Sequence, residues 1–154
     1  MLNYMFMPFR RYAEFSGRSR RMEFWSYNLF NLIVYAILGF VLVGTMGGMG
    51  AFDPATAAAN PGGMFAVLFG GFGLVIGLYF LATFIPTLAV TVRRLHDRDM
   101  SGWWYLGFIV LSLIPLVGFL VSIAFLVIMF LPGTPGPNRF GADPKDPSDM
   151  QVFA

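Results

Sequence analysis

The chain has 154 residues, of which 57% are hydrophobic and only 12% are charged, and it contains no cysteine. A soluble domain carries about a quarter charged residues, and a water-soluble protein this small could not bury so much apolar surface. The composition therefore predicts an integral membrane protein. The lack of cysteine excludes disulfides, thiolate catalysis, zinc–sulfur sites and iron–sulfur clusters.

The charged residues bracket long uncharged stretches and so define the predicted spans. Apart from Asp53, they fall within residues 10–23, 93–99 and 139–149. A helix needs about 20 apolar residues to cross the hydrocarbon core, and the uncharged stretches lack the alternation typical of membrane β-strands. We predict an all-α, polytopic fold with long apolar segments near Trp25–Gly47, Met64–Val90 and Trp103–Leu131. The Gly-, Ala- and Pro-rich residues 44–63 are predicted to form a loop.

Two details of this fold need a separate argument. Residues 2–15 place apolar side chains at helical spacing on one face, which predicts a short amphipathic helix on the membrane surface. The third apolar segment would be about 43 Å long as one straight helix, and Pro115 and Gly118 lie near its middle. It is either one kinked helix or a helical hairpin, which gives three or four spans; we prefer the hairpin.

The distribution of basic residues predicts the orientation. Residues 10–23 and 93–99 are rich in arginine, whereas residues 44–63 contain neither Lys nor Arg. Because cytoplasmic segments carry the excess of Lys and Arg, we expect a cytoplasmic N-terminus. Trp25, Trp103 and Trp104 adjoin the charged segments and are expected to anchor the helices at the membrane interface. We predict one membrane domain over residues 1–144 and a polar tail over residues 145–154.

The arginine-rich segments are the candidate functional surface. Arginine makes planar, forked contacts with carboxylates and phosphates, and these segments lie on the same predicted membrane face. The alternative is that the arginines only reflect orientation and pair with Glu23, Asp97 or Asp99; Glu23 is spaced to pair with Arg20. The candidate residues for binding anionic headgroups or a partner protein are Arg18, Arg20, Arg21, Arg93, Arg94, His96, Asp97, Arg98 and Arg139.

The sequence predicts no catalytic residue, metal site or cofactor. His96, Asp97 and Ser101 could act as a triad only if they converged in space, which sequence neighbours rarely do, so a boundary histidine is favoured. One histidine without cysteine offers no metal-ligand pattern, and no phosphate-binding loop is present. Gly73 and Gly77 are one turn apart and predict close helix packing, within the chain rather than in a dimer.

Three motifs in the chain carry a family resemblance: Phe15–Trp25 (FSGRSRRMEFW), Arg93–Trp104 (RRLHDRDMSGWW) and Pro132–Pro144 (PGTPGPNRFGADP). In this order they resemble the signatures of the bacterial domain of unknown function 805 family. The resemblance implies a small, multi-pass bacterial inner-membrane protein without an assigned activity. If all three motifs lie on one membrane face they form a single polar site, and this requires the hairpin.

These observations favour a non-catalytic membrane module whose cytoplasmic arginine-rich surface binds anionic lipid headgroups or a partner protein. A small oligomeric transporter or channel is the alternative, because the spans are rich in glycine and uncharged polar residues. An enzyme acting on a lipid phosphate, with His96 as the acid–base group, ranks last. The expected partners are membrane lipids, with a membrane protein or a second copy of the chain left open; no nucleic-acid partner is expected.

Overall fold

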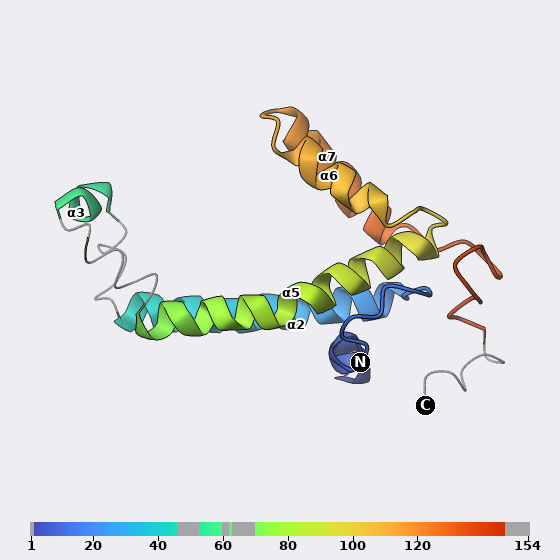
Figure 1. Cartoon of the computed structure of the whole chain (residues 1–154), viewed down its shortest axis with the longest axis horizontal. Coiled ribbons are helices and arrows are strands. Elements are labelled where there is room, and N and C mark those ends of the chain that lie inside the picture. The colour runs from blue at the N-terminus through green and yellow to red at the C-terminus, as the bar shows by residue number, and fades with distance from the viewer. Residues whose placement is uncertain (1, 46–52, 60–61, 63–69, 147–154) are drawn as a thin grey trace. The chain divides into compact units, whose positions relative to one another are not determined.

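The computed structural model describes residues 2–45, 53–59, 62 and 70–146, and every regular element in these ranges is a helix (Figure 1). The predicted all-α fold is confirmed. Most of the predicted tail, residues 147–154, lies outside the described residues, as do residues 64–69 of the second apolar segment. The helices are α1 (Leu2–Arg10), α2 (Arg21–Thr45), α3 (Pro54–Ala59), α5 (Gly71–Asp97), α6 (Trp103–Ser112) and α7 (Val117–Phe130).

Two of these helices, α2 and α5, are long and apolar enough to cross a membrane. Only 11% and 28% of the residues in their most apolar windows are buried within the chain, so most of both helices is left uncovered by the chain itself. Both helices extend further into the charged segments than expected: α2 begins at Arg21, and α5 continues to Asp97. Helix α5 therefore carries Arg93, Arg94 and Asp97 on its last turns.

Residues 54–59 correct the prediction of a loop over residues 44–63. They form the short helix α3, with sequence PATAAA. Alanine has the highest helix propensity, and proline suits the first helical position. Asp53 precedes the helix, and its Oδ1 accepts a hydrogen bond of 3.1 Å from the amide of Ala55. The alanines therefore act here as helix formers rather than as loop residues.

The chain divides into two compact units, one of Met1–Tyr27 and Ile85–Ala154 and the other of Asn28–Phe84. In the second unit α2 and α5 pair through polar side chains. The Tyr79 hydroxyl donates to Asn31 Oδ1 at 2.8 Å, and the hydroxyls of Tyr35 and Thr83 lie 3.1 Å apart. Such bonds specify a helix pair in lipid, where apolar burial alone gives little preference.

The close helix packing predicted at Gly73 and Gly77 remains a prediction. Among the described residues, no atom outside the neighbouring backbone of the same helix lies within 4 Å of the position that a Cβ of Gly77 would occupy. Gly73 is half-buried.

Within the first unit, α1 packs on α2 through Phe9, whose ring meets that of Tyr27 with the centroids 5.4 Å apart. The helix expected over residues 2–15 is therefore present, but it ends at Arg10. A turn follows in which Arg11 donates to the carboxylate of Glu14 at 2.6 and 2.5 Å. This hydrogen-bonded pair lowers the pKa of Glu14.

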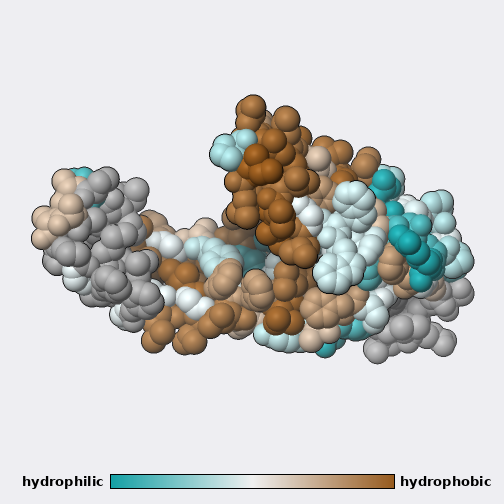
Figure 2. Space-filling view, turned by 45° about the horizontal axis from the view of Figure 1, so that its top comes forward, coloured by the Kyte–Doolittle hydropathy of each residue, from teal (hydrophilic) through white to brown (hydrophobic). Residues whose placement is uncertain are grey.

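Helices α6 and α7 form a hairpin, which confirms this alternative over the single kinked helix. They lie side by side in Figure 1, and the rings of Tyr105 and Phe108 both face Phe125, at 5.8 and 5.4 Å. The turn includes Leu116 at a positive φ of 67°. The surface of the hairpin is almost uniformly hydrophobic (Figure 2), and α6 buries no residue.

The hairpin arms are short. With 10 and 14 residues, they are about 15 and 21 Å long. A hydrocarbon core is about 30 Å thick. Each arm therefore reaches only part of the way across such a core.

Gly118 provides a test of the hairpin, because a Cβ at this position would overlap the backbone carbonyl of Ser112. We expect Gly118→Ala to lower the free energy of unfolding by about 1–3 kcal/mol, since the two arms must separate. Gly107→Ala, in α6, is the matched control because open space surrounds its Cβ position. Denaturant titration in detergent micelles measures both, and equal stability of the two variants would contradict this packing.

Candidate functional site

The three sequence motifs meet at the C-terminal end of α5. The last carbonyls of a helix lack partners within the helix and need donors from elsewhere. The Ser19 amide donates to the Arg93 carbonyl at 3.1 Å, and the Thr134 amide donates to the Asp97 carbonyl at 2.8 Å. The Asn138 side-chain amide donates to the His96 carbonyl at 2.9 Å. The first and third motifs thus complete the helix end that the second motif forms.

Asp97 is the charged centre of this meeting point. Arg18 Nε donates to Asp97 Oδ1 at 3.0 Å, and Arg94 Nη1 donates to Oδ2. The three side chains are at most 3% exposed. Buried charges are tolerated when they are paired and hydrogen-bonded. Arg18 also donates to the carbonyls of Thr134 and Gly136, at 2.6 Å each, so it joins all three motifs.

Gly133 lets the third motif pass directly over Asp97. A Cβ at Gly133 would overlap both carboxylate oxygens of Asp97. Any larger residue would therefore displace the chain from the carboxylate, or the carboxylate from its arginines. The Pro-Gly opening of the third motif has a packing reason here, beyond its tendency to end a helix.

Further arginines cap the C-terminal end of α7. Arg94 donates to the carbonyls of Met129 (3.3 Å) and Leu131, and Arg21 donates to that of Phe130 (3.3 Å). Arg98 donates to the carbonyl of Pro132. A helix C-terminus carries a partial negative charge and unpaired carbonyls, which attract cations. We call Arg18, Arg21, Arg94, Arg98 and Asp97, with the carbonyls that they bind, the arginine cap.

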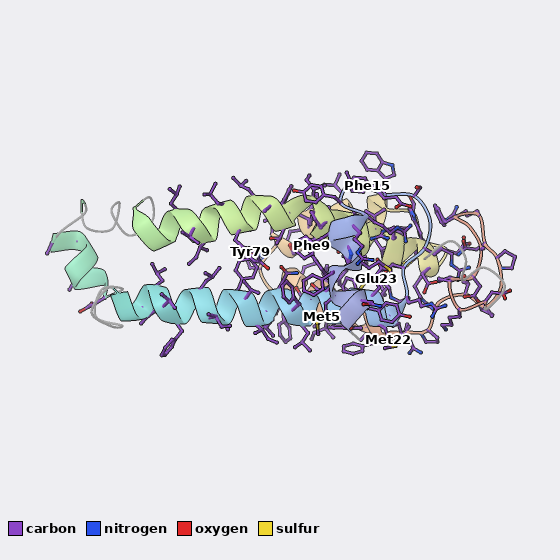
Figure 3. All side chains as sticks on the ribbon, turned by 90° about the horizontal axis from the view of Figure 1, so that it is seen from below. Met5, Phe9, Phe15, Met22, Glu23 and Tyr79 are labelled. Carbon is purple, nitrogen blue, oxygen red and sulfur yellow. The ribbon has the colours of Figure 1, made fainter. Side chains whose placement is uncertain are left out.

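A second buried ion pair lies beside the cap. Glu23 Oε1 is 3.0 Å from Arg93 Nη2, and both side chains are at most 3% exposed. The Ser19 hydroxyl donates to the other carboxylate oxygen at 2.8 Å. Glu23 therefore pairs with Arg93 rather than with Arg20, which donates to the Pro144 carbonyl instead. Figure 3 labels Glu23 and Phe9 in this first unit.

Asp143 holds the third motif in its folded form. Its carboxylate accepts hydrogen bonds of 3.0 Å from the amides of Lys145 and Gly136. These hydrogen bonds lower the pKa of Asp143, and the bond from the Lys145 amide has the larger effect. Asn138 and Gly141 form a small antiparallel bridge in the same segment.

His96 faces the first and third motifs. Its Nδ1 lies 3.2 Å from the Gly17 carbonyl, and its ring stacks on Phe140 with the centroids 3.9 Å apart. The carboxylate of Asp97 is turned to Arg18 and Arg94 rather than to His96. Among the described residues, no three His, Asp or Glu side chains are grouped as metal ligands.

Burial divides the candidate binding residues into an interior and a rim. Arg18, Arg93, Arg94 and Asp97 are buried, while Arg20, His96 and Arg98 are half-buried. The exposed arginines are Arg21 and Arg139, together with Arg10, which was not a candidate. Arg139 pairs with Asp99 at 3.1 Å and lies over the Phe140 ring.

The predicted interface anchors also differ in exposure. Trp103 and Trp104 are 79% and 56% exposed, as anchors in lipid headgroups would be. Trp25 is half-buried, and its ring stacks on Phe130 with the centroids 4.1 Å apart. Thr134, Asn138 and Phe140 lie in the third motif but were not among the candidate site residues. They contact the backbone carbonyls of Asp97 and His96 and the ring of His96. Such contacts cannot be predicted from residue types and spacing alone.

Asp97 and Asp99 offer a matched comparison, because both pair with arginine and only Asp97 is buried. We expect Asp97→Ala to lower the free energy of unfolding by about 3–5 kcal/mol, since two arginines lose their buried counter-charge. Asp99→Ala removes a pair whose side chains are 47% and 60% exposed and should cost less than about 1 kcal/mol. Denaturant titration in micelles measures both, and similar losses would refute a central role for Asp97.

Comparison with known proteins agrees with this architecture. The chain is 39% identical over 136 residues to the inner membrane protein YhaH of Escherichia coli strain K12, covering 88% of this chain and 91% of that protein. The inner membrane protein YhaI of the same strain matches with the same identity and length, covering 88% and 90%. The uncharacterized protein YiiR of this strain is 31% identical over 151 residues, covering 86% and 87%.

No solved structure matches the chain. The model of a family described as "Protein of unknown function (DUF805)" matches residues 12–142, which include all three motifs. With its apolar helices and inner-membrane relatives, the chain is a bacterial membrane protein that belongs to the DUF805 family.

Proposed function

We propose that this protein is a non-catalytic inner-membrane module that binds anionic phospholipid headgroups through its rim, the exposed arginines Arg10, Arg21 and Arg139. The observation that carries the proposal is the division of the arginines by burial. Arg18, Arg93 and Arg94 are occupied by Asp97, Glu23 and backbone carbonyls. Arg10, Arg21 and Arg139 are exposed. The interior thus acts as a scaffold, and the rim presents cations at the surface, where Arg21 also donates to the Phe130 carbonyl and Arg139 also pairs with Asp99.

The chemistry of the rim favours lipid phosphate. Each basic residue near an anionic membrane surface contributes about 1 kcal/mol to binding, and arginine can bind a phosphate through two parallel hydrogen bonds. The exposed Trp103 and Trp104 suit the headgroup level of a bilayer. A rim of this kind therefore suits anionic lipids at the membrane surface.

The proposal includes a topology. In it α2 and α5 each cross the membrane once, and the α6–α7 hairpin enters and leaves from the cytoplasmic side. Two observations support it. The hairpin arms, about 15 and 21 Å long, are shorter than the hydrocarbon core. The contacts of Arg18 with Asp97 and Thr134 need all three motifs on one membrane face, which the arginine distribution predicts to be cytoplasmic.

Retention of lipid by the purified protein tests the function. We expect the triple variant Arg10→Gln, Arg21→Gln, Arg139→Gln to lose bound phosphatidylglycerol by at least about tenfold in native mass spectrometry. Lys145→Gln removes one exposed charge outside the rim and is expected to leave retention unchanged. If the triple variant retains as much lipid as the unaltered protein, the proposal fails. Loss of a co-purifying protein without loss of lipid would favour the partner-protein alternative.

Cysteine labelling tests the topology, because the chain has no cysteine of its own. Ala58→Cys in α3 should react from the periplasm with a membrane-impermeant maleimide. Leu113→Cys, at the hairpin turn and 78% exposed, should react only after the membrane is dissolved in detergent, and a reporter fused after Ala154 should lie in the cytoplasm. Equal periplasmic labelling at both cysteines would mean that the hairpin crosses completely.

A further inference from the structure

A groove runs between the two arms of the hairpin and has a volume of about 360 Å³. The Ser112 hydroxyl donates to the carbonyl of Ile109 at 2.7 Å, and the Ser122 hydroxyl donates to that of Gly118 at 2.8 Å. Both serine hydroxyls are thus satisfied within their own helices, and apart from these serines and the Tyr105 side chain the lining residues are apolar. Its walls include Tyr105, Phe108 and Ser112 from α6 and Ser122, Phe125 and Leu126 from α7.

One end of the groove points toward the arginine cap. On a helix, residues four positions apart lie on the same face, so the face of α7 that carries Leu126 continues to Phe130. Arg21 donates to the Phe130 carbonyl at 3.3 Å and is exposed. A four-residue step along a helix is about 6 Å. An exposed guanidinium therefore lies about one helical turn beyond an apolar slot, an arrangement complementary to an amphiphile with an anionic head.

The length of the hairpin matches one leaflet. Arms of about 15 and 21 Å extend from the cap to roughly the middle of a core about 30 Å thick. An acyl chain of the same leaflet also runs from the headgroup level to the middle of the bilayer. The groove therefore runs in the same direction as an acyl chain of that leaflet, and Arg21 lies at the end where the headgroup would be.

We propose that the hairpin groove binds one acyl chain of an anionic glycerophospholipid of the inner leaflet, whose phosphate contacts Arg21. This inference rests on the proposed function and specifies the place on the protein where the acyl chain of the lipid binds. It commits to a lipid occupant because the positive charge at the polar end complements a phosphate, while the groove itself offers mostly apolar contact. A second copy of the chain would instead have to place a charged or polar group beside Arg21.

Filling the groove tests the inference. We expect Ser122→Leu to reduce retention of phosphatidylglycerol about tenfold in native mass spectrometry of the full chain, because the added methylene groups displace part of the acyl chain. Ser112→Leu, on the opposite wall, is a second variant that guards against a folding defect in the first. Ala124→Leu adds similar bulk at an exposed position of α7 outside the groove lining and is expected to change nothing.

Photocrosslinking locates the chain directly. Phosphatidylglycerol with a diazirine in its acyl chain is expected to label peptides that contain Tyr105 or Phe125, and Ser122→Leu should abolish this labelling. Labelling spread evenly over the apolar helices, with normal retention in Ser122→Leu, would overturn the groove while leaving the rim proposal intact if the rim triple variant still loses lipid. If the triple variant also retains lipid, both proposals fail. Peptide–peptide crosslinks between two copies at the groove would identify a second chain as the occupant.

Discussion

A single buried carboxylate, that of Asp97, organises the end of the molecule where the three motifs meet. It neutralises Arg18 and Arg94 at once, and each of these arginines extends to backbone carbonyls that follow α7 or belong to it. Without this counter-charge, two guanidinium groups would be buried unpaired, which is among the most costly arrangements in a protein interior. Gly133 passes so close to this carboxylate that a side chain at position 133 would collide with it, so the third motif needs a glycine there.

The sequence predicted the helical class, the long apolar segments and the preference for a hairpin, because these follow from the cost of burying charge and from the length of a crossing. It did not predict that α5 would carry Arg93, Arg94 and Asp97 within its helix, since charged residues were taken to mark the helix end. Glu23 shows why local spacing is not enough to predict an ion pair. Its spacing suggested Arg20 as the partner, whereas in the fold it pairs with Arg93 from another helix. Backbone carbonyls have no residue identity, so the acceptors of the cap cannot be recognised in a sequence.

Helix polarity explains why arginine is concentrated in these segments. The C-terminal ends of α5 and α7 lie in the same cap, and together they bring a surplus of unpaired carbonyls and partial negative charge. Arginine suits this place because its fork can serve a carboxylate and a carbonyl simultaneously, as Arg94 does. Lysine has a single ammonium group and could not span the same set of acceptors in a fixed geometry. Most of the clustered arginine in this protein thus serves the structure, by pairing with buried carboxylates and helix-end carbonyls.

The long separation between Arg18 and its acceptors in the third motif has a consequence for biogenesis. The residues joined by this hydrogen bond are 118 positions apart, so a nascent chain synthesised from its N-terminus exposes Arg18 before Gly136 exists. The cap can close only after the residues that follow α7 have been synthesised. A chain cut short before Gly136 would leave Arg18 without one of the carbonyls that it binds. The cap is therefore completed last, after every helix of the chain has been synthesised.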